Sequence, residues 1–386
     1  MFASHKIFGQ TAARLTNQPF KYMKFSISKE KLLEALVTVQ NVVSTRTTLP
    51  ILSNVLIRAE EGRLIFTTND LDCGISTSVE AQIERGGGTT LPARRLGGIV
   101  KELPSADVQV EVDAKNHASM RCGQSFFKMM GIAEEEFPAL PKLENAKTFT
   151  LKQQDLKDAL RKTNYAISTD ETRYVLNGIL FTFKENKLSL VATDGRRLAL
   201  CDIEVEFPRG QEIDNIIPTK CVGELQRLLT EVGEVKMSVT ENHVAFEANN
   251  KTLVSKLIEG NYPNYKQVIP QETRERVTIE REILLAAVRR VSLLSSEKSN
   301  SIKLIFTKNN LEIASNTPEV GEAHESLAIT YKGKDIAIAF NPGFLQDPLR
   351  NLPDEEVHID LIDEMSPGVI KIATPFLYVL MPMRIS

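Results

Sequence analysis

A 22-residue segment that occurs three times constrains the fold of this chain more than any other feature. The copies at 23–44, 147–168 and 275–296 align without gaps. Their starts are 124 and 128 residues apart (147 − 23 and 275 − 147). That separation is the length of a domain and exceeds the roughly 20–50-residue unit of solenoid repeats. The 386-residue chain is therefore expected to contain three copies of one domain.

Each copy has the pattern of a strand followed by an amphipathic helix. In the first copy Phe25 and Ile27 are two residues apart, which is typical of strand alternation. Apolar residues then recur at offsets of 3, 4 and 7, which predicts one buried helical face. The equivalent helix positions are Leu32, Ala35, Leu36 and Val39, then Leu156, Ala159, Leu160 and Thr163, then Leu284, Ala287, Val288 and Val291.

The similarity continues downstream of these segments. Alternating strands that end in polar turns are followed by a strand end and a second helix. The strands are expected at 63–70, 187–194 and 310–316, and the second helices within 90–103, 216–229 and 339–352. Pro348 lies well inside the last of these helices, so it is expected to kink or shorten that helix.

Many short strands with two helices per repeat predict an α+β fold, in which the helices cover one face of antiparallel sheet. The N-terminal segment 1–22 has no acidic residue and no apolar signal-peptide core, so it is expected to be a disordered extension or an upstream start. Proline-rich stretches separate the repeats. The domains are expected to span 23–143, 147–270 and 271–386.

The composition is ordinary for a water-soluble globular protein, and no apolar run approaches the ~18 residues needed to cross a membrane. The cysteines are Cys73, Cys122, Cys201 and Cys221. They form no Cys-x-x-Cys pair and lie near no histidine cluster, so no metal or other cofactor is expected. We expect buried, reduced cysteines in a cytoplasmic protein.

Basic residues recur on the exposed faces of the predicted helices, although the formal net charge is −3. Three equivalent domains would present them as related basic surfaces. Such surfaces suit a DNA duplex that is held by its phosphates without sequence readout. The alternative is that they only solvate helix faces, together with acids such as Glu30 and Asp155. The basic residues are Lys29, Lys31, Arg94, Arg95, Lys101, Lys157, Arg161, Lys162, Lys220, Arg227, Arg281, Arg289, Arg290 and Arg350.

The stretch VATDGRRLAL (191–200) combines a carboxylate, a glycine and two arginines, a set of groups also found in catalytic loops. A hydrolase or transferase that uses Asp194 would also need a base and an orienting group. The histidines are scattered, and the chain has no GxSxG, Walker, HExxH or GxGxxG motif. Polar TTND and IASN occupy the same place in the other repeats, so Asp194–Gly195 is predicted to be a turn, and no enzyme activity is expected.

Five stretches resemble the bacterial DNA polymerase III beta subunit, the sliding clamp and processivity factor. They are TLPILSN (48–54), YVLNGILF (174–181), VATDGRRLAL, GNYPNYKQVIP (260–270) and VLMPMRIS (379–386), in this order. The resemblance covers residues 23–386 and implies three clamp domains per chain and a ring-shaped head-to-tail homodimer. Helices line the hole and antiparallel sheets form the rim. Such a ring encircles double-stranded DNA, is not an enzyme, and tethers the polymerase catalytic subunit.

The resemblance also implies a groove between the second and third domains for linear motifs of the polymerase, the clamp loader and repair proteins. The terminal methionines fit this function, because methionine-rich surfaces adapt to different partner peptides. Arg196, Gln267 and Ser299 differ from residues that some members carry at the groove edge. The implied lining residues are Leu176, Thr193, Gly195, Arg196, Arg197, Leu198, Pro263, Val268, Asn341, Phe344, Val379, Leu380, Met381, Pro382, Met383 and Arg384.

Two further sites follow from the resemblance. Arg46 is implied to contact DNA, and Arg94 and Arg95 are expected to do the same. Leu293 and Leu294 are expected to face the partner subunit's first domain near its Phe127 and Met129, although such a leucine pair could also be simple core. The alternative function is a scaffold of the same fold that binds partners without encircling DNA.

Overall fold

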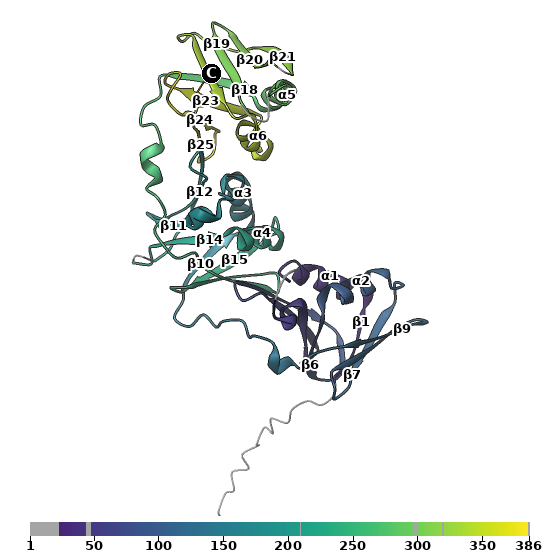
Figure 1. Cartoon of the computed structure of the whole chain (residues 1–386). Coiled ribbons are helices and arrows are strands. Elements are labelled where there is room, and N and C mark those ends of the chain that lie inside the picture. The colour runs from purple at the N-terminus through teal and green to yellow at the C-terminus, as the bar shows by residue number, and fades with distance from the viewer. Residues whose placement is uncertain (1–22, 44–47, 209, 296–299, 319, 385–386) are drawn as a thin grey trace, which may run out of the picture. The chain divides into compact units, whose positions relative to one another are not determined.

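The computed structural model describes residues 23–43, 48–208, 210–295, 300–318 and 320–384. These residues divide into two compact units (Figure 1). The first contains 23–68 and 76–138, and the second contains 69–75 and 139–384. No helix in the described ranges is long and apolar enough to cross a membrane.

The first unit starts with strand β1 (Met23–Ser28), which runs directly into helix α1 (Lys29–Gln40). The burial of β1 alternates strictly, and α1 buries the four residues that its sequence pattern predicted. Helix α2 (Ala93–Glu102) lies beside α1 (Figure 1). The predicted strand–helix unit is therefore confirmed in the first repeat.

Two sheets support these helices. The first has the antiparallel order β5-β1-β7-β8-β9, with β5 at Gln82–Arg85, β7 at Asp107–Val112, β8 at His117–Cys122 and β9 at Ser125–Met130. The second contains β2 (Asn54–Glu60), β3 (Arg63–Asn69), β4 (Cys73–Glu80) and β6 (Gly87–Pro92). Short 3-10 turns lie at Pro50–Ser53 and Glu134–Glu136.

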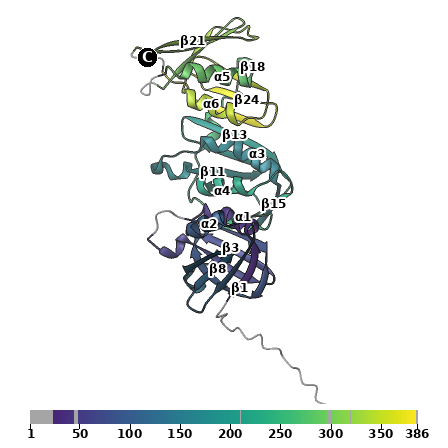
Figure 2. The same ribbon diagram turned by 90° about the vertical axis from the view of Figure 1, so that its right-hand side faces the viewer.

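The second unit contains the second and third repeats. The second repeat has strands β10 (Lys147–Lys152), β11 (Gly178–Lys184), β12 (Lys187–Thr193), β13 (Arg197–Glu204), β14 (Ile213–Pro218), β15 (Glu234–Val239), β16 (His243–Ala248) and β17 (Lys251–Lys256), and helices α3 (Gln153–Thr163) and α4 (Thr219–Leu228). Figure 2 shows α3 beside β13, on which it packs. Turns η3 (Asn164–Ala166), η4 (Glu171–Leu176) and η5 (Tyr265–Val268) complete this part.

The third repeat follows the same plan. Its strands are β18 (Glu275–Glu280), β19 (Ile302–Thr307), β20 (Asn310–Thr317), β21 (Gly321–Ala328), β22 (Ile336–Phe340), β23 (Glu356–Leu361), β24 (Gly368–Lys371) and β25 (Phe376–Leu380), and its helices are α5 (Arg281–Ser292) and α6 (Pro342–Asn351). Figures 1 and 2 both show α5 beside α6. All four predicted helix-face positions are buried in both α3 and α5.

One eight-stranded sheet joins these two repeats, in the order β14-β11-β12-β13-β25-β24-β23-β18. Its middle is the antiparallel pair β13–β25, in which Leu198 lies opposite Val379. The hairpin of the second repeat and the last strand of the chain are thus hydrogen-bonded neighbours, and this junction positions the site.

The expectation that Pro348 shortens its helix is wrong. Helix α6 has ten residues, as do α2 and α4. Proline has no N–H, so the carbonyl of Phe344, four residues earlier, loses its helical donor. The hydroxyl of Tyr378 donates to that carbonyl at 2.7 Å instead. Because this bond replaces the missing one, the helix continues through the proline.

All four cysteines are buried and free, as predicted. Burial raises the pKa of the Cys73 thiol to about 12 and that of the Cys201 thiol to about 11. A thiol that stays protonated at neutral pH is a poor nucleophile and a poor metal ligand. These side chains therefore contribute to packing.

Candidate functional site

The stretch that first suggested chemistry is the turn of the β12–β13 hairpin. The Asp194 carboxylate accepts hydrogen bonds from the backbone N–H groups of Arg196 and Arg197 at 2.9 and 3.0 Å. Gly195 has a φ of 85°, a left-handed conformation that favours glycine. The Thr193 hydroxyl donates to the Arg197 carbonyl at 2.6 Å and closes the loop. The predicted turn is confirmed, and its carboxylate is used to shape the backbone.

Arg173 holds this turn from outside. Its guanidinium donates to the Asp194 carbonyl at 2.9 Å and to the Asp170 carboxylate at 2.9 Å. A Cβ atom at Gly195 would lie 2.8 Å from the Arg173 guanidinium, so a larger residue here would push that side chain from its place. Hydrogen bonds from Thr172, and then from Arg173, lower the pKa of Asp170 and keep that carboxylate charged.

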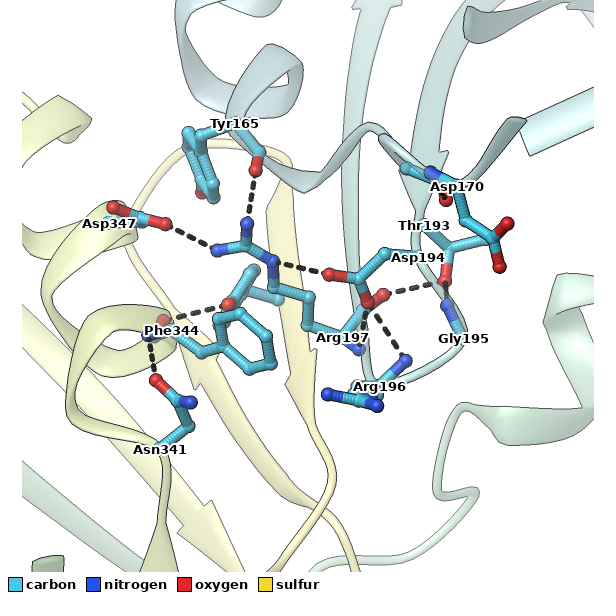
Figure 3. A network of polar contacts seen from close by, with 12 residues as sticks. Tyr165, Asp170, Thr193, Asp194, Gly195, Arg196, Arg197, Asn341, Phe344 and Asp347 are labelled. Atoms are coloured by element: carbon cyan, nitrogen blue, oxygen red, sulfur yellow. Dashed lines mark hydrogen bonds and ion pairs between the residues drawn. The ribbon is translucent and has the colours of Figure 1, made fainter. Parts of the chain in front are cut away.

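The guanidinium of Arg197 lies between the second and third repeats (Figure 3). Its Nε donates to Asp194 at 3.0 Å, one Nη donates to Asp347 on α6, and the other donates to the Tyr165 carbonyl at 2.5 Å. Its carbon centre lies 4.2 Å from the centre of the Phe344 ring, a cation–π contact. Each of its three nitrogens thus has an acceptor within the protein.

The electrostatics keep Arg197 charged. Burial alone would lower the pKa of its guanidinium, but the neighbouring Tyr378 and Asp347 outweigh burial and raise that pKa. The side chain is only 9% exposed. The guanidinium is therefore a largely buried cation with an acceptor for each of its nitrogens.

Leu198 belongs to a different environment from Arg197, because successive residues of a strand point to opposite faces of the sheet. It packs in an apolar group that we call the floor cluster, formed by Leu180, Val191, Leu198, Ile216 and Val379. The segment that connects the second and third repeats covers part of it with Tyr262, Tyr265 and Ile269. The Tyr262 hydroxyl donates to the Val191 carbonyl at 3.4 Å. The members of the floor cluster are at most 6% exposed, so they form a buried apolar core under this face of the shared sheet.

The chain's terminal segment borders the same place. The Met381 N–H donates to the Arg196 carbonyl at 3.0 Å, and the Met383 N–H donates to the Ala339 carbonyl at 2.8 Å. Met381 is exposed, while Pro382 and Met383 are half-buried. The structure therefore brings the TDGRRL and MPMR stretches together, although about 180 residues separate them in the chain.

Helix α6 supplies the third border. The Asn341 side chain caps this helix by accepting from the Phe344 N–H at 3.1 Å. Phe344 is half-buried, and its ring contacts the Arg197 guanidinium. The helix cap thus fixes the orientation of Asn341, and the contact with Arg197 fixes that of the Phe344 ring.

The remaining predicted groove residues lie on the second repeat and the connecting segment. Leu176 is buried at the end of η4, whereas Pro263 and Val268 are exposed. Pro263 lines a depression together with Leu180, Ile216 and Tyr262. Arg384 is exposed, and Leu380 is buried opposite Arg197 in the sheet.

The predicted DNA residues Arg94 and Arg95 are exposed on α2. Arg46, segment 1–22 and the edge residue Ser299 lie outside the described residues. Their predicted roles are therefore unaffected by the structure.

The predicted seam residues are distributed over both units. In the first unit Phe127 is exposed on β9, an outer strand of its sheet, and Met129 is half-buried against a small apolar cavity. In the second unit Leu293 is 79% exposed just after α5, and Leu294 is half-buried. An apolar side chain as exposed as Leu293 is unexplained by packing within its own domain.

Sequence reasoning missed Tyr165, Asp347 and Tyr378 as parts of this site. Asp347 lies three residues after Phe344, on the same helical face, and that spacing was an available signal. Nothing local marked Tyr165 or Tyr378, because their partners are remote in the chain.

Comparison with protein-family models identifies three domains of the DNA polymerase III beta subunit. The N-terminal domain matches residues 23–141, the central domain 150–264 and the C-terminal domain 266–384. The chain is also 36% identical over 363 residues to the beta sliding clamp of Chlamydia muridarum. That match covers 94% of this chain and 99% of the relative.

Solved structures agree with the sequence matches. The DNA polymerase sliding clamp from Bacillus subtilis matches with a TM-score of 0.91 at 32% identity, over 95% of this chain and 100% of that one. A sliding clamp from Pseudomonas aeruginosa, crystallised with griselimycin bound, matches with a TM-score of 0.91 at 34% identity, over 94% and 100% of the two chains. The chain belongs to the DNA polymerase III beta subunit family, the beta sliding clamps.

Proposed function

We propose that two copies of this chain close into a ring around duplex DNA and tether the replicative polymerase to it. The same ring would hold the clamp loader and repair proteins through their linear motifs. The sliding clamp family is non-catalytic, and the carboxylate of Asp194 is accordingly engaged by its own turn. The observation that carries the proposal is the junction of TDGRRL and MPMR on one sheet, in a chain of this family.

The partner groove lies on the face of the floor cluster. A peptide's apolar anchors would pack against the half-buried side chains that cover this cluster, such as Tyr262 and Tyr265, while backbone and polar groups at the rim fix its direction. Exposed Met381 is flexible enough to fit different anchors. The proposed lining residues are Leu176, Thr193, Gly195, Arg196, Arg197, Leu198, Pro263, Val268, Asn341, Phe344, Val379, Leu380, Met381, Pro382, Met383 and Arg384.

The proposed DNA contacts are few and weak. Arg94, Arg95 and Arg46 would each meet phosphates, which carry no sequence information. A closed ring holds DNA by topology, so it needs little direct affinity. Weak phosphate contacts let it move along the duplex and make those contacts sensitive to salt.

The proposed seam joins Leu293 and Leu294 of the third domain to the first domain of the partner subunit, near Phe127 and Met129. A two-fold ring built in this way has two identical seams. Each subunit would contribute three similar domains to the ring, at 23–143, 147–270 and 271–386. Free, buried cysteines suit a reducing compartment, and we propose a cytoplasmic location.

Retention on circular DNA tests this function. The protein is loaded by a bacterial clamp loader on a nicked circular duplex, freed of loader by gel filtration, and followed before and after one restriction cut. We expect stable retention on the circle and rapid loss from the linear form, because a ring slides off free ends. Equal loss from both forms would support a non-encircling scaffold. The matched control is a second circle whose restriction site is covered by a bound protein, so that the enzyme cannot cut it.

A further inference from the structure

We propose that Arg197 and Asp347 are positioning residues that hold the partner groove open in its binding shape, and that the Arg197 guanidinium does not itself bind the partner peptide. This inference rests on the proposed partner groove and deepens it. Arg197 still borders the groove, but its guanidinium acts through the residues that it holds in place. Four observations carry this inference.

First, the contacts of Arg197 cross from one repeat to the next. Asp194 and Tyr165 belong to the second repeat, whereas Asp347 and the Phe344 ring belong to α6 of the third. A single side chain thus connects the hairpin turn to the helix (Figure 3). Moving α6 away from the turn would break the ion pair and the ring contact together.

Second, the guanidinium has little left to offer a ligand. Its side chain is 9% exposed, and its Nε and both Nη atoms already donate to protein oxygens. Each Nη keeps a second N–H, but a peptide oxygen would have to reach it on a side chain that is only 9% exposed. Displacing Asp194 or Asp347 instead would leave a charge without its partner, which is costly.

Third, each neighbour of this network borders the groove. The Arg196 carbonyl receives the Met381 N–H, and Leu198 is part of the floor cluster. The Phe344 ring makes the cation–π contact with the Arg197 guanidinium, and the Phe344 carbonyl accepts a hydrogen bond from the Tyr378 hydroxyl. The network therefore fixes the turn, the helix start and the terminal segment relative to one another.

Fourth, Pro348 makes one of these connections available. An ordinary residue at this position would donate its N–H to the Phe344 carbonyl, so Tyr378 would share that acceptor with the helix. With proline, the same carbonyl ties α6 to β25. The first turn of α6 is thus held by Arg197 on its ring and by Tyr378 on its backbone.

The test uses a fluorescein-labelled peptide that carries the clamp-binding motif of a bacterial replicative polymerase, with affinity read by anisotropy. The informative variant is Asp347→Asn, which keeps the shape of the side chain and removes its charge. We expect affinity to fall by about 3- to 30-fold, which lies within the range of interaction energies for residues of one network. The matched control is Glu325→Gln, because Glu325 also pairs with an arginine of the third repeat and is 23% exposed, against 29% for Asp347. The control should change affinity by less than about twofold.

Arg197→Lys separates positioning from direct binding. Lysine keeps the positive charge but has one nitrogen in place of the fork that reaches three acceptors. If Arg197 positions the groove, Arg197→Lys weakens binding as Asp347→Asn does, and the double variant is no worse than either single one. If Arg197 contacts the peptide as a cation, Asp347→Asn leaves affinity unchanged or improves it, and the proposal is overturned.

Hydrogen exchange without peptide gives a readout that a general loss of stability would not produce. In Asp347→Asn the amides of Met381 and Met383 should exchange faster, while core amides of β19 keep their wild-type rates. Unchanged exchange at both methionines would contradict the proposal. Wild-type protein that did not bind the peptide at all would overturn the groove itself. If the wild-type protein and Asp347→Asn bind the peptide with equal affinity, only the positioning role is overturned.

Discussion

Replacement of Tyr378 by phenylalanine removes a hydrogen bond between a helix and a strand, and also the contact of the hydroxyl with Arg197. Tyr378 is fully buried, and its hydroxyl donates to the Phe344 carbonyl at 2.7 Å. Phenylalanine keeps the ring in place but leaves this carbonyl buried beside Pro348, which has no N–H to offer. Leaving a buried acceptor unsatisfied costs about 1–3 kcal/mol, so we expect the third repeat to lose about 2 kcal/mol of stability.

The reasoning predicts a specific rescue. Pro348→Ala supplies an N–H four residues after Phe344, so the carbonyl regains a helical donor. In the Pro348→Ala background, Tyr378→Phe should therefore cost about 1–2 kcal/mol less than in the wild-type background. Native-state hydrogen exchange of the slowest amides in β19 and β20 measures this, because a protein of three domains does not unfold in one step.

Tyr331→Phe is the matched control. Its hydroxyl also donates to a carbonyl of the third repeat, that of Lys334, but has no connection with Pro348. Its cost should be the same in both backgrounds. Equal costs of Tyr378→Phe with and without Pro348 would refute the explanation for the unbroken helix.

Three further predictions concern the ring, its DNA contacts and its pH dependence. Leu293→Asp should change the stability of the subunit by less than about 0.5 kcal/mol, because the side chain is exposed. It should, however, convert the dimer seen in sedimentation to the 43.1 kDa monomer. A variant that remained a dimer would remove Leu293 from the seam. Combined Arg94→Ala and Arg95→Ala should weaken salt-dependent DNA contacts by about tenfold at low salt and leave peptide affinity unchanged; a salt slope equal to that of wild type would argue against phosphate contact. Asp360 is buried, which alone would raise its pKa, but hydrogen bonds from Arg276 and then Lys371 outweigh burial and hold that pKa below its ordinary value of 3.8. Because the folded-state pKa is the lower one, this contribution to stability is present above about pH 4 and is lost as pH falls through the folded value, so acid titration of unfolding should be flatter in Asp360→Asn.

The sequence predicted the repeated elements well because their signals are local. The spacing of Leu32, Ala35, Leu36 and Val39 requires one buried face in a helix of 3.6 residues per turn, and that face is buried. Asp194–Gly195 forms the expected turn because a short carboxylate and a glycine satisfy it without help from elsewhere. The shortening expected at Pro348 was wrong for the opposite reason, because the donor that compensates for the proline comes from another strand.

Threefold repetition, helix faces, strand alternation and the family resemblance were thus determined by the sequence itself, since each depends on residues within a few positions of one another or on motifs that can be read directly. The partners of Arg197 were decided only by the tertiary structure. Asp347 lies 150 residues from it along the chain and reaches it because β13 and β25 pair in one sheet. Long-range pairing depends on the packing of the whole unit, which no local spacing encodes. For this reason the sequence predicted which residues surround the groove, while the folded chain decided which of them contact one another.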